Sequence, residues 1–336
     1  MSWEPGGEVT AWLLGLGLGV APPVRYDRMA GGRSNMLFLV TDADGRRWVL
    51  RRPPEGELLA SAHDVVREHR ILSGLAAVGF PAPAPLGLCT DEAVAPVPLL
   101  LLEHVDGVAI DGPDAAEAQP PAWRGAAATA LAATLAAVHA VDLEVAGLRE
   151  LAARTSYGER QLRRWRRQWA ATRTRELPRV EALADRLEAR IPAFVEPVLV
   201  HGDYHLRNVL FAAEDGRVAT VLDWELCTLG DPMADVGALL AYWPQPGDDG
   251  PQPNPTALVD GFPDRAAMAD AYAAASGRVL DELAFWESLA CWKVAIILEG
   301  VLRREVDAGI ETPGRAAMID AMLLRAERAL DAGAGG

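Results

Sequence analysis

Three polar residues in one segment of the chain, Asp203, Asn208 and Asp223, have types and spacing that suit a chemical task. Asp203 opens a loop, Asn208 closes it, and Asp223 ends the last of three apolar, β-branched runs typical of buried strands. An aspartate at such a loop can accept a proton from an attacking hydroxyl group. An amide and a second carboxylate supply oxygen ligands for Mg²⁺ on the phosphates of a nucleotide. The pattern therefore predicts phosphoryl transfer, with Asp203 as proton acceptor and Asn208 and Asp223 as metal ligands.

Two other interpretations of this segment remain open. In the first, it is a polar turn between core strands, and Asn208 and Asp223 only satisfy backbone amides. In the second, His201, Asp203 and His205 bind a hydrolytic metal, but that site needs further ligands. The remaining histidines occur singly, at His63, His69, His104 and His139. The spacing D-x-x-x-x-N, followed by a hairpin and a second Asp, favours phosphoryl transfer because it repeats that of the protein-kinase catalytic loop.

Two longer runs carry a resemblance to a known family. They are H-G-D-Y-H-L-R-N-V-L-F at 201–211 and V-L-D-W-E-L-C-T-L-G-D-P-M-A-D at 221–235. Together they resemble the aminoglycoside phosphotransferase superfamily, and the second run is most similar to the branch related to the domain fused to certain acyl-CoA dehydrogenases. The resemblance extends from about residue 24 to about residue 328. It implies an α+β, protein-kinase-like bilobal fold, with an N-terminal nucleotide-binding lobe (1–104) and a helical C-terminal lobe (105–336).

The resemblance also implies where the nucleotide binds. The run A-G-G-R-S-N-M-L-F-L-V at 30–40 has small residues before a strand, which let backbone amides approach phosphates closely. A plain hairpin is the alternative, because the G-x-G-x-x-G spacing is absent. The residues expected to cover the nucleotide are Gly31, Gly32, Ser34 and Asn35. By the same resemblance, Glu103 and Val105 belong to a hinge whose backbone holds the adenine.

A kinase-like fold needs a cation on its third strand to hold the α- and β-phosphates. The only lysine of this chain is Lys293, so the first half has none, and V-L-R places Arg51 at the matching position. Arg52 is then its neighbour on the opposite face of the strand. The resemblance implies that Glu68, on a helix predicted from 61 to 75, pairs with Arg51. The alternative is that Arg51 is a solvated arginine at the end of a strand.

The N-terminal lobe is expected to contain a small five-stranded antiparallel sheet with one helix. The second lobe is expected to be mainly helical, with Asp235 tying a helix to the catalytic loop. Its helix around 160–169 carries a cluster of five arginines, which either face water or receive an anionic substrate. Lys293 lies among apolar residues and needs a partner.

Composition limits the partners and the location of the protein. The chain has 336 residues, 47 acidic and 32 basic, and a net charge of −15, which argues against nonspecific binding to nucleic acid. Its three cysteines lack metal or redox spacing and suggest a reducing compartment. We identify neither a signal peptide nor a stretch that could cross a membrane. These features predict a cytoplasmic protein whose partner is a small molecule, and they leave the oligomeric state open.

The predicted reaction is the transfer of the γ-phosphate of ATP or GTP, with Mg²⁺, to the hydroxyl group of a small molecule. Resemblance to the dehydrogenase-fused branch implies a hydroxyacyl compound as acceptor. The name of the superfamily implies instead an aminoglycoside or macrolide antibiotic. A nucleotide-binding protein without turnover is the opposing class.

Overall fold

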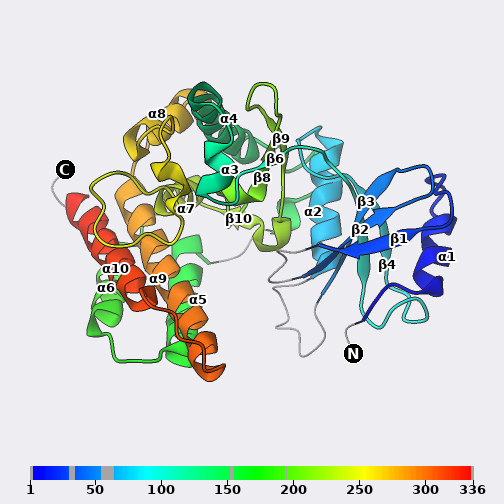
Figure 1. Ribbon diagram of the computed structural model, residues 1–336. Helices are drawn as coiled ribbons and strands as arrows, with labels where there is room; N and C mark the ends of the chain where they lie inside the picture. The colour runs from blue at the N-terminus through cyan, green and yellow to red at the C-terminus, as the bar shows by residue number, and fades with distance from the viewer. Residues whose placement is uncertain (1–2, 30–34, 54–63, 152–154, 194, 334–336) are drawn as a thin grey trace. The chain divides into compact units, whose positions relative to one another are not determined.

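The protein is represented by a computed structural model that describes residues 3–29, 35–53, 64–151, 155–193 and 195–333 (Figure 1). The chain divides into two compact units. The first comprises Met1–Gly107, Glu144–Leu148 and Ala219–Leu226, and the second comprises Val108–Leu143, Arg149–Val218 and Cys227–Gly336.

A five-stranded sheet forms the first unit, with the strand order β1-β2-β3-β5-β4 and antiparallel pairing throughout. The strands are β1 (Arg25–Arg28), β2 (Met36–Thr41), β3 (Arg47–Arg52), β4 (Pro85–Cys89) and β5 (Leu99–Glu103). The register pairs Arg51 with Leu37 on one side and with Leu100 on the other. The predicted antiparallel sheet is confirmed, and Arg51 lies on its central strand.

Alternating side chains divide the sheet into two faces, as the pleat of a strand requires. On one face, Leu50, Leu99 and Leu101 are fully buried in a cluster with Val9 and Leu13 of helix α1 (Gly7–Gly15). Helix α2 (Val65–Ala77) packs against strands β4 and β5. The sheet therefore has an apolar cluster on one face and can present Arg51 to the other.

Helix α2 begins four residues later than the sequence predicted. Its N-cap is Asp64, whose Oδ1 accepts hydrogen bonds from the backbone N–H groups of Val66 and Arg67, each at 3.0 Å. The predicted start at Ser61 lies outside the described residues. The buried face of the helix contains Glu68 as well as Leu72, so a carboxylate lies in the interior of the first unit.

The segment 219–226 belongs to the first unit although it lies far along the chain. The N–H of Val221 donates to the carbonyl of Pro81 at 2.8 Å, and the ring of Trp224 meets that of Phe80 edge to face at 5.6 Å. The first unit also extends to Gly107. This division differs from the predicted boundary at 104/105, because contacts between residues about 140 positions apart decide it.

The second unit is mainly helical, with short strands around the catalytic loop. Its strands β7 (Val198–Val200) and β10 (Thr228–Gly230) pair antiparallel, as do β6 (Val108–Ala109) and β8 (Val209–Phe211). The strand β9 (Val218–Val221) begins in this unit and continues into the segment 219–226 of the first unit. The helices are α3 (Pro113–Glu117), α4 (Pro121–His139), α5 (Tyr157–Thr172), α6 (Pro178–Glu188), α7 (Pro232–Ala241), α8 (Arg265–Ser276), α9 (Leu283–Asp307) and α10 (Arg315–Ala332). None of the helices within the described ranges is long and apolar enough to cross a membrane.

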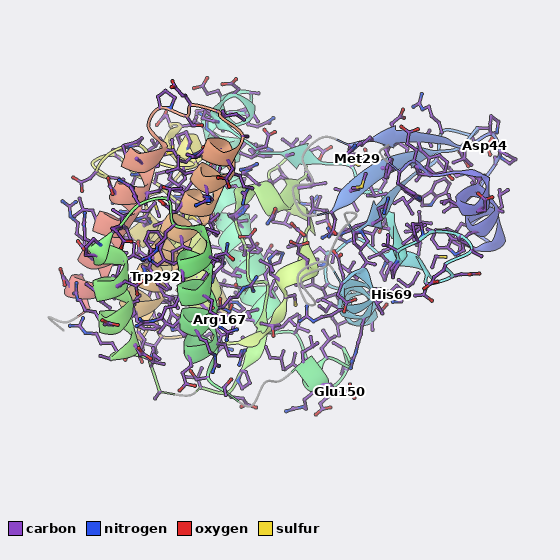
Figure 2. The ribbon with its side chains drawn as sticks, turned by 90° about the horizontal axis from the view of Figure 1, so that it is seen from below. Met29, Asp44, His69, Glu150, Arg167 and Trp292 are labelled. Atoms are coloured by element: carbon purple, nitrogen blue, oxygen red, sulfur yellow. The ribbon has the colours of Figure 1, made fainter. Side chains whose placement is uncertain are left out.

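Helix α9 runs through the centre of the second unit and contacts α5, α6, α7 and α10. Trp292 lies in the interior of this unit (Figure 2), and its indole N–H donates to the carbonyl of Val180 at 3.0 Å. A Cβ at Gly237 would lie 2.5 Å from the carbonyl carbon of Trp286, so α7 approaches α9 as closely as only glycine allows. This packing fixes the two helices that flank the catalytic loop.

Candidate active site

The predicted catalytic loop follows β7 in the second unit, and a buried aspartate fixes its first turn. The N–H groups of His201 and Gly202 donate to the two carboxylate oxygens of Asp235, at 2.6 and 2.9 Å. Asp235 lies in the first turn of α7 and is 1% exposed. Gly202 has φ = +85°, a backbone conformation that side-chain-bearing residues rarely adopt. Asp235 thus makes the predicted link between α7 and the catalytic loop.

Asp203 has the environment expected of a proton acceptor. Its Oδ2 lies 3.5 Å from Nε2 of His205, and the amide Nδ2 of Asn208 donates to its backbone oxygen at 2.8 Å and to Oδ2 at 3.2 Å. Burial acts to raise the pKa of Asp203, but the hydrogen bond and charge of His205 and the charge of Lys293 outweigh it and lower the pKa well below its usual range. Asp203 is therefore a carboxylate at neutral pH, and its side chain is 30% exposed.

Replacing Asp235 by asparagine tests how strongly the turn depends on it. We expect the free energy of unfolding to fall by about 1–3 kcal/mol, because the amide retains one acceptor oxygen for two buried N–H groups. Thermal unfolding measures this as a lower Tm. The matched control is Asp264→Asn, which changes an exposed carboxylate that caps α8 by accepting from Ala267, where asparagine caps equally well. Equal Tm values for Asp235→Asn and the wild type would contradict the assignment.

In the first unit, one guanidinium is shared by three carboxylates. Arg51 Nε lies 2.8 Å from Oε2 of Glu68, and its Nη2 lies 2.9 Å from Oδ1 of Asp223 and 3.0 Å from Oε2 of Glu225. Asn35 also donates to Glu225, at 3.0 Å. The pair between Arg51 and Glu68 that the resemblance implied is present. Arg51 is 7% exposed, so the alternative of a solvated strand-end arginine is wrong.

The carboxylates of this cluster influence one another's protonation. Burial raises the pKa of Glu68 to about 7; Arg51 opposes this rise, whereas the neighbouring Asp223 and Glu225 add to it. Asp223 is the most exposed of the three carboxylates, at 37% of its side chain. It also has φ = +62°, an uncommon conformation that aspartate and asparagine tolerate better than most residues. Asp223 is therefore the carboxylate of this cluster that is most open to a divalent cation.

The metal ligands predicted from the sequence fit Mg²⁺ in their chemistry. Asp223 offers a partly exposed carboxylate, and since Nδ2 of Asn208 is a donor, its Oδ1 is the atom that can act as a ligand. Mg²⁺ commonly takes one or two protein ligands and completes its shell with water and substrate phosphates. Among the described residues, no group of three or more His, Cys, Asp or Glu side chains could hold a metal by itself. That finding gives no support to the metallohydrolase interpretation of His201, Asp203 and His205.

The remaining predicted residues have mixed outcomes. Gly31, Gly32 and Ser34 lie outside the described residues, whereas Asn35 is described and is 4% exposed. Glu103 ends β5, and Val105 is half-buried in the connection that leads to β6. Their roles toward a nucleotide stay predictions. The neighbour of Arg51 on the strand, Arg52, is fully buried with its guanidinium 4.3 Å from the ring of Trp3.

Two residues of the site were missed. Glu225 stands two positions after Asp223 in D-W-E, and a second carboxylate so close to the predicted metal ligand was a usable signal. Lys293 donates through Nζ to the carbonyl of Gly202 at 3.1 Å, a contact between residues 91 positions apart that no local pattern indicates.

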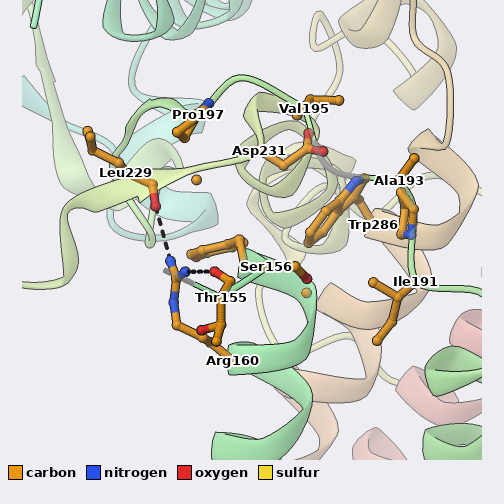
Figure 3. A pocket seen from close by; sticks show the side chains of 14 residues that line it. Thr155, Ser156, Arg160, Ile191, Ala193, Val195, Pro197, Leu229, Asp231 and Trp286 are labelled. Carbon is orange, nitrogen blue, oxygen red and sulfur yellow. Dashed lines mark hydrogen bonds between the residues drawn. The ribbon is translucent and has the colours of Figure 1, made fainter. Parts of the chain in front are cut away.

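A hollow of about 350 Å³ adjoins the catalytic turn in the second unit. Gly202 and Lys293 line it together with side chains from α5, α7 and α9, among them Tyr157, Gln161, Trp165 and Trp286. A second hollow, of about 440 Å³, shares Tyr157 and Trp286 with the first (Figure 3). The predicted catalytic turn therefore borders a partly aromatic hollow through Gly202.

The arginine cluster of α5 divides into two groups. Arg160 donates to the carbonyls of Thr155 and Leu229 (Figure 3), and Arg166 pairs with Asp185 at 2.8 Å and Glu188 at 3.0 Å. These two arginines bind neighbouring parts of the same unit. The other three are exposed, at Arg163, Arg164 and Arg167. Of these, Arg164 lies 5.5 Å from the ring of Trp165, a residue of the first hollow.

Comparisons with known proteins show which family the sequence matches. The sequence matches the phosphotransferase enzyme family over residues 26–286. It is 34% identical over 303 residues to mouse acyl-CoA dehydrogenase family member 10. The aligned region covers 87% of this chain but only 27% of the mouse protein. The chain thus spans about a quarter of the length of that relative.

Solved structures show the same fold. A Ralstonia eutropha protein described as aminoglycoside phosphotransferase-like superposes with a TM-score of 0.79 at 29% identity, over 98% of each chain. An amicoumacin kinase solved with AMP-PNP, Ca²⁺ and its antibiotic superposes with a TM-score of 0.63 at 16% identity, over 96% of this chain and 94% of that one. The α+β kinase-like fold predicted from the sequence is confirmed.

Proposed function

Because the chain belongs to the phosphotransferase enzyme family, we propose that it transfers the γ-phosphate of ATP to the hydroxyl group of a small molecule. One observation carries this proposal. Asp203 is an ionised, partly exposed carboxylate on a turn that Asp235 fixes, and the residue before it, Gly202, lines a hollow of the same unit. Such a carboxylate can orient a hydroxyl group and accept its proton as the phosphoryl group is transferred.

The other residues receive roles that follow from their chemistry. Asn208 and Asp223 would hold Mg²⁺, which neutralises charge on the phosphates. Arg51, oriented by Glu68, would position the α- and β-phosphates. The residues proposed to cover the nucleotide are Gly31, Gly32, Ser34 and Asn35, and those proposed to hold the adenine are Glu103 and Val105. GTP is the alternative donor.

The acceptor that we propose is a hydroxyacyl compound. Lys293 contributes a positive charge to the lining of the hollow, and the aromatic residues of that lining suit an apolar chain. The mouse relative, named an acyl-CoA dehydrogenase, supports the same class. A polycationic aminoglycoside would be repelled by this positive charge. Aminoglycosides, macrolides and a nucleotide-binding role without turnover are therefore the alternatives.

A transfer assay with γ-labelled ATP and Mg²⁺ tests this proposal. The acceptors are hydroxy acids, hydroxyacyl-CoAs, aminoglycosides and macrolides, each with wild-type protein and with Asp203→Asn. Labelled phosphate on a hydroxyacyl compound, lost in the variant, is the expected result. Transfer to an antibiotic and to no hydroxyacyl compound would show that the acceptor is an antibiotic. Nucleotide binding without transfer to any acceptor would favour the alternative of a nucleotide-binding protein without turnover.

Arg51→Met is expected to raise the KM for ATP and lower kcat, reducing kcat/KM by about 10- to 100-fold, the cost of a lost hydrogen bond to a charged group. Arg51→Lys should restore only part of the loss, because one ammonium replaces a fork that contacts Glu68 through Nε and Asp223 through Nη2. Steady-state kinetics measure both variants.

The control for this prediction is Arg52→Met, which removes the neighbouring guanidinium from the opposite face of β3. It contacts the ring of Trp3, so we expect a lower Tm but an unchanged KM for ATP in the folded protein. A silent Arg51→Met beside a damaging Arg52→Met would contradict the assignment of Arg51.

We also propose a cytoplasmic location and no nucleic-acid partner. Three cysteines, Cys89, Cys227 and Cys291, are free and buried, which suits a reducing compartment. The net charge of −15 disfavours contact with a phosphate backbone.

A further inference from the structure

Lys293 is the only lysine of the chain, and it lies on α9 beside the catalytic turn. Its Nζ donates to the carbonyl of Gly202 at 3.1 Å and lies 5.5 Å from the centre of the Trp165 ring. The side chain lines the cavity next to Gly202. An ammonium group in such a place loses water contacts and is stable only where a carbonyl, a carboxylate or a ring face replaces them.

Gly202 is held from both sides of its backbone. Its N–H donates to Asp235 of α7 at 2.9 Å, and its carbonyl accepts from Lys293 of α9 at 3.1 Å. Opposite charges on two packed helices therefore fix one residue, and the next residue in the chain is Asp203. Gly202 has φ = +85° and no side chain to hold it, so these two contacts restrain the turn.

We propose that Lys293 is a positioning residue for phosphoryl transfer, which fixes the Gly202 carbonyl from α9 and supplies a positive charge to the turn that carries Asp203. This inference rests on the proposed function of Asp203. Lys293, Gly202, Asp203 and Asp235 all belong to the second unit.

The charged groups around Lys293 come from three elements. They are Asp203 of the catalytic loop, Arg164 of α5 and Asp235 of α7. Burial lowers the pKa of Lys293, Asp203 and Asp235 act to raise it, and Arg164 acts to lower it, with a net pKa below the usual value. In return, the charge of Lys293 helps to lower the pKa of Asp203. The two groups are thus coupled through charge as well as through the backbone of Gly202.

The first experiment compares Lys293→Met with Lys293→Arg. Methionine keeps most of the apolar stem but loses the donor and the charge, so kcat should fall about 10- to 100-fold while the Kd for Mg·ATP stays unchanged. Arginine keeps a donor and a charge and should recover part of kcat. Steady-state kinetics and calorimetry separate the two constants.

The control is Arg325→Met, which removes another buried cation that donates to backbone carbonyls, those of Leu240 and Ala241 at the end of α7. It does not line the cavity at Gly202. We expect a lower Tm with a normal kcat for the folded protein. An unchanged kcat in Lys293→Met, or an equal loss per folded molecule in Arg325→Met, would overturn the proposal.

The second experiment uses the single lysine as a probe that needs no turnover. Reductive methylation with ¹³C-formaldehyde labels Lys293 and the terminal amine, and the Lys293→Arg variant identifies the lysine signal. The titration of this signal should move to lower pH in Asp203→Asn, because a negative charge that stabilises the ammonium is gone. An identical titration in both proteins would show that the two groups are not coupled and would overturn the proposal.

The two experiments also separate this inference from the function on which it rests. If the wild-type chain transfers phosphate to no acceptor, the proposed function fails, and the role of Lys293 in that reaction fails with it. The titration still reports whether Lys293 and Asp203 are coupled. If transfer occurs, but Lys293→Met leaves kcat unchanged and Asp203→Asn leaves the titration of Lys293 unchanged, only the positioning role of Lys293 is wrong.

Discussion

Asp203→Asn is expected to reduce kcat by about 10²- to 10⁴-fold, the usual effect of losing a general base, while the Kd for Mg·ATP changes little. Asparagine can still accept a hydrogen bond from the acceptor hydroxyl, but it cannot take its proton. It is nearly isosteric, so the contacts that Asn208 makes with the backbone oxygen of residue 203 are kept. Single-turnover transfer and calorimetry measure the two effects separately.

The matched control for this change is Asp215→Asn. Asp215 lies on the same stretch of chain, but it is exposed and bonds Arg217. We expect its kcat to equal that of the wild type. Near-normal turnover in Asp203→Asn, with normal Mg·ATP binding, would remove Asp203 from the reaction and leave a turn-forming role.

Asp223→Asn is expected to abolish the Mg²⁺-dependent part of ATP binding, because an amide is a poor replacement for a carboxylate that binds the metal. Asparagine is the suitable substitution here, since it tolerates the left-handed backbone at φ = +62°. Alanine would add backbone strain to the loss of charge. Calorimetry of ATP binding with and without Mg²⁺, at equal ionic strength, measures the effect.

Glu225→Gln is the matched control, because it removes a second carboxylate bound to the same guanidinium of Arg51. We expect it to weaken Mg·ATP binding less than Asp223→Asn does, since the side chain of Glu225 is 10% exposed and that of Asp223 is 37% exposed. If Asp223→Asn bound Mg·ATP as tightly as the wild type, Asp223 would be a structural residue at the end of β9.

The sequence by itself determined the parts of the site that are local in the chain. Asp203 and Asn208 lie in one loop five residues apart, so their spacing almost fixes the hydrogen bond between them. The strand before the loop shows as an apolar, β-branched run because both its faces are covered. Arg51 was also found from the sequence, because the run V-L-R puts an arginine at the position where the resembled family has its strand cation, in a half of the chain without lysine.

The sequence was a weaker guide to where a helix begins and to which of the two units a segment belongs. The sequence suggested that α2 begins at Ser61, but the helix begins at Val65 and Asp64 is its N-cap. Serine and aspartate are both favourable N-cap residues, so the sequence alone does not decide between them. The segment 219–226 was placed in the helical lobe because it follows the catalytic loop in the chain. Its bond to Pro81 and its packing on Phe80 put it in the first unit instead.

Only the tertiary structure decided which charges share a site. Glu225 reaches Arg51 across 174 positions, and Lys293 reaches Gly202 across 91. In the sequence, each of these residues looks like an ordinary charge on a turn or a helix. A charged group that is removed from water is stable only beside an opposite charge or a dipole, and only the folded chain shows which partner each of these residues has.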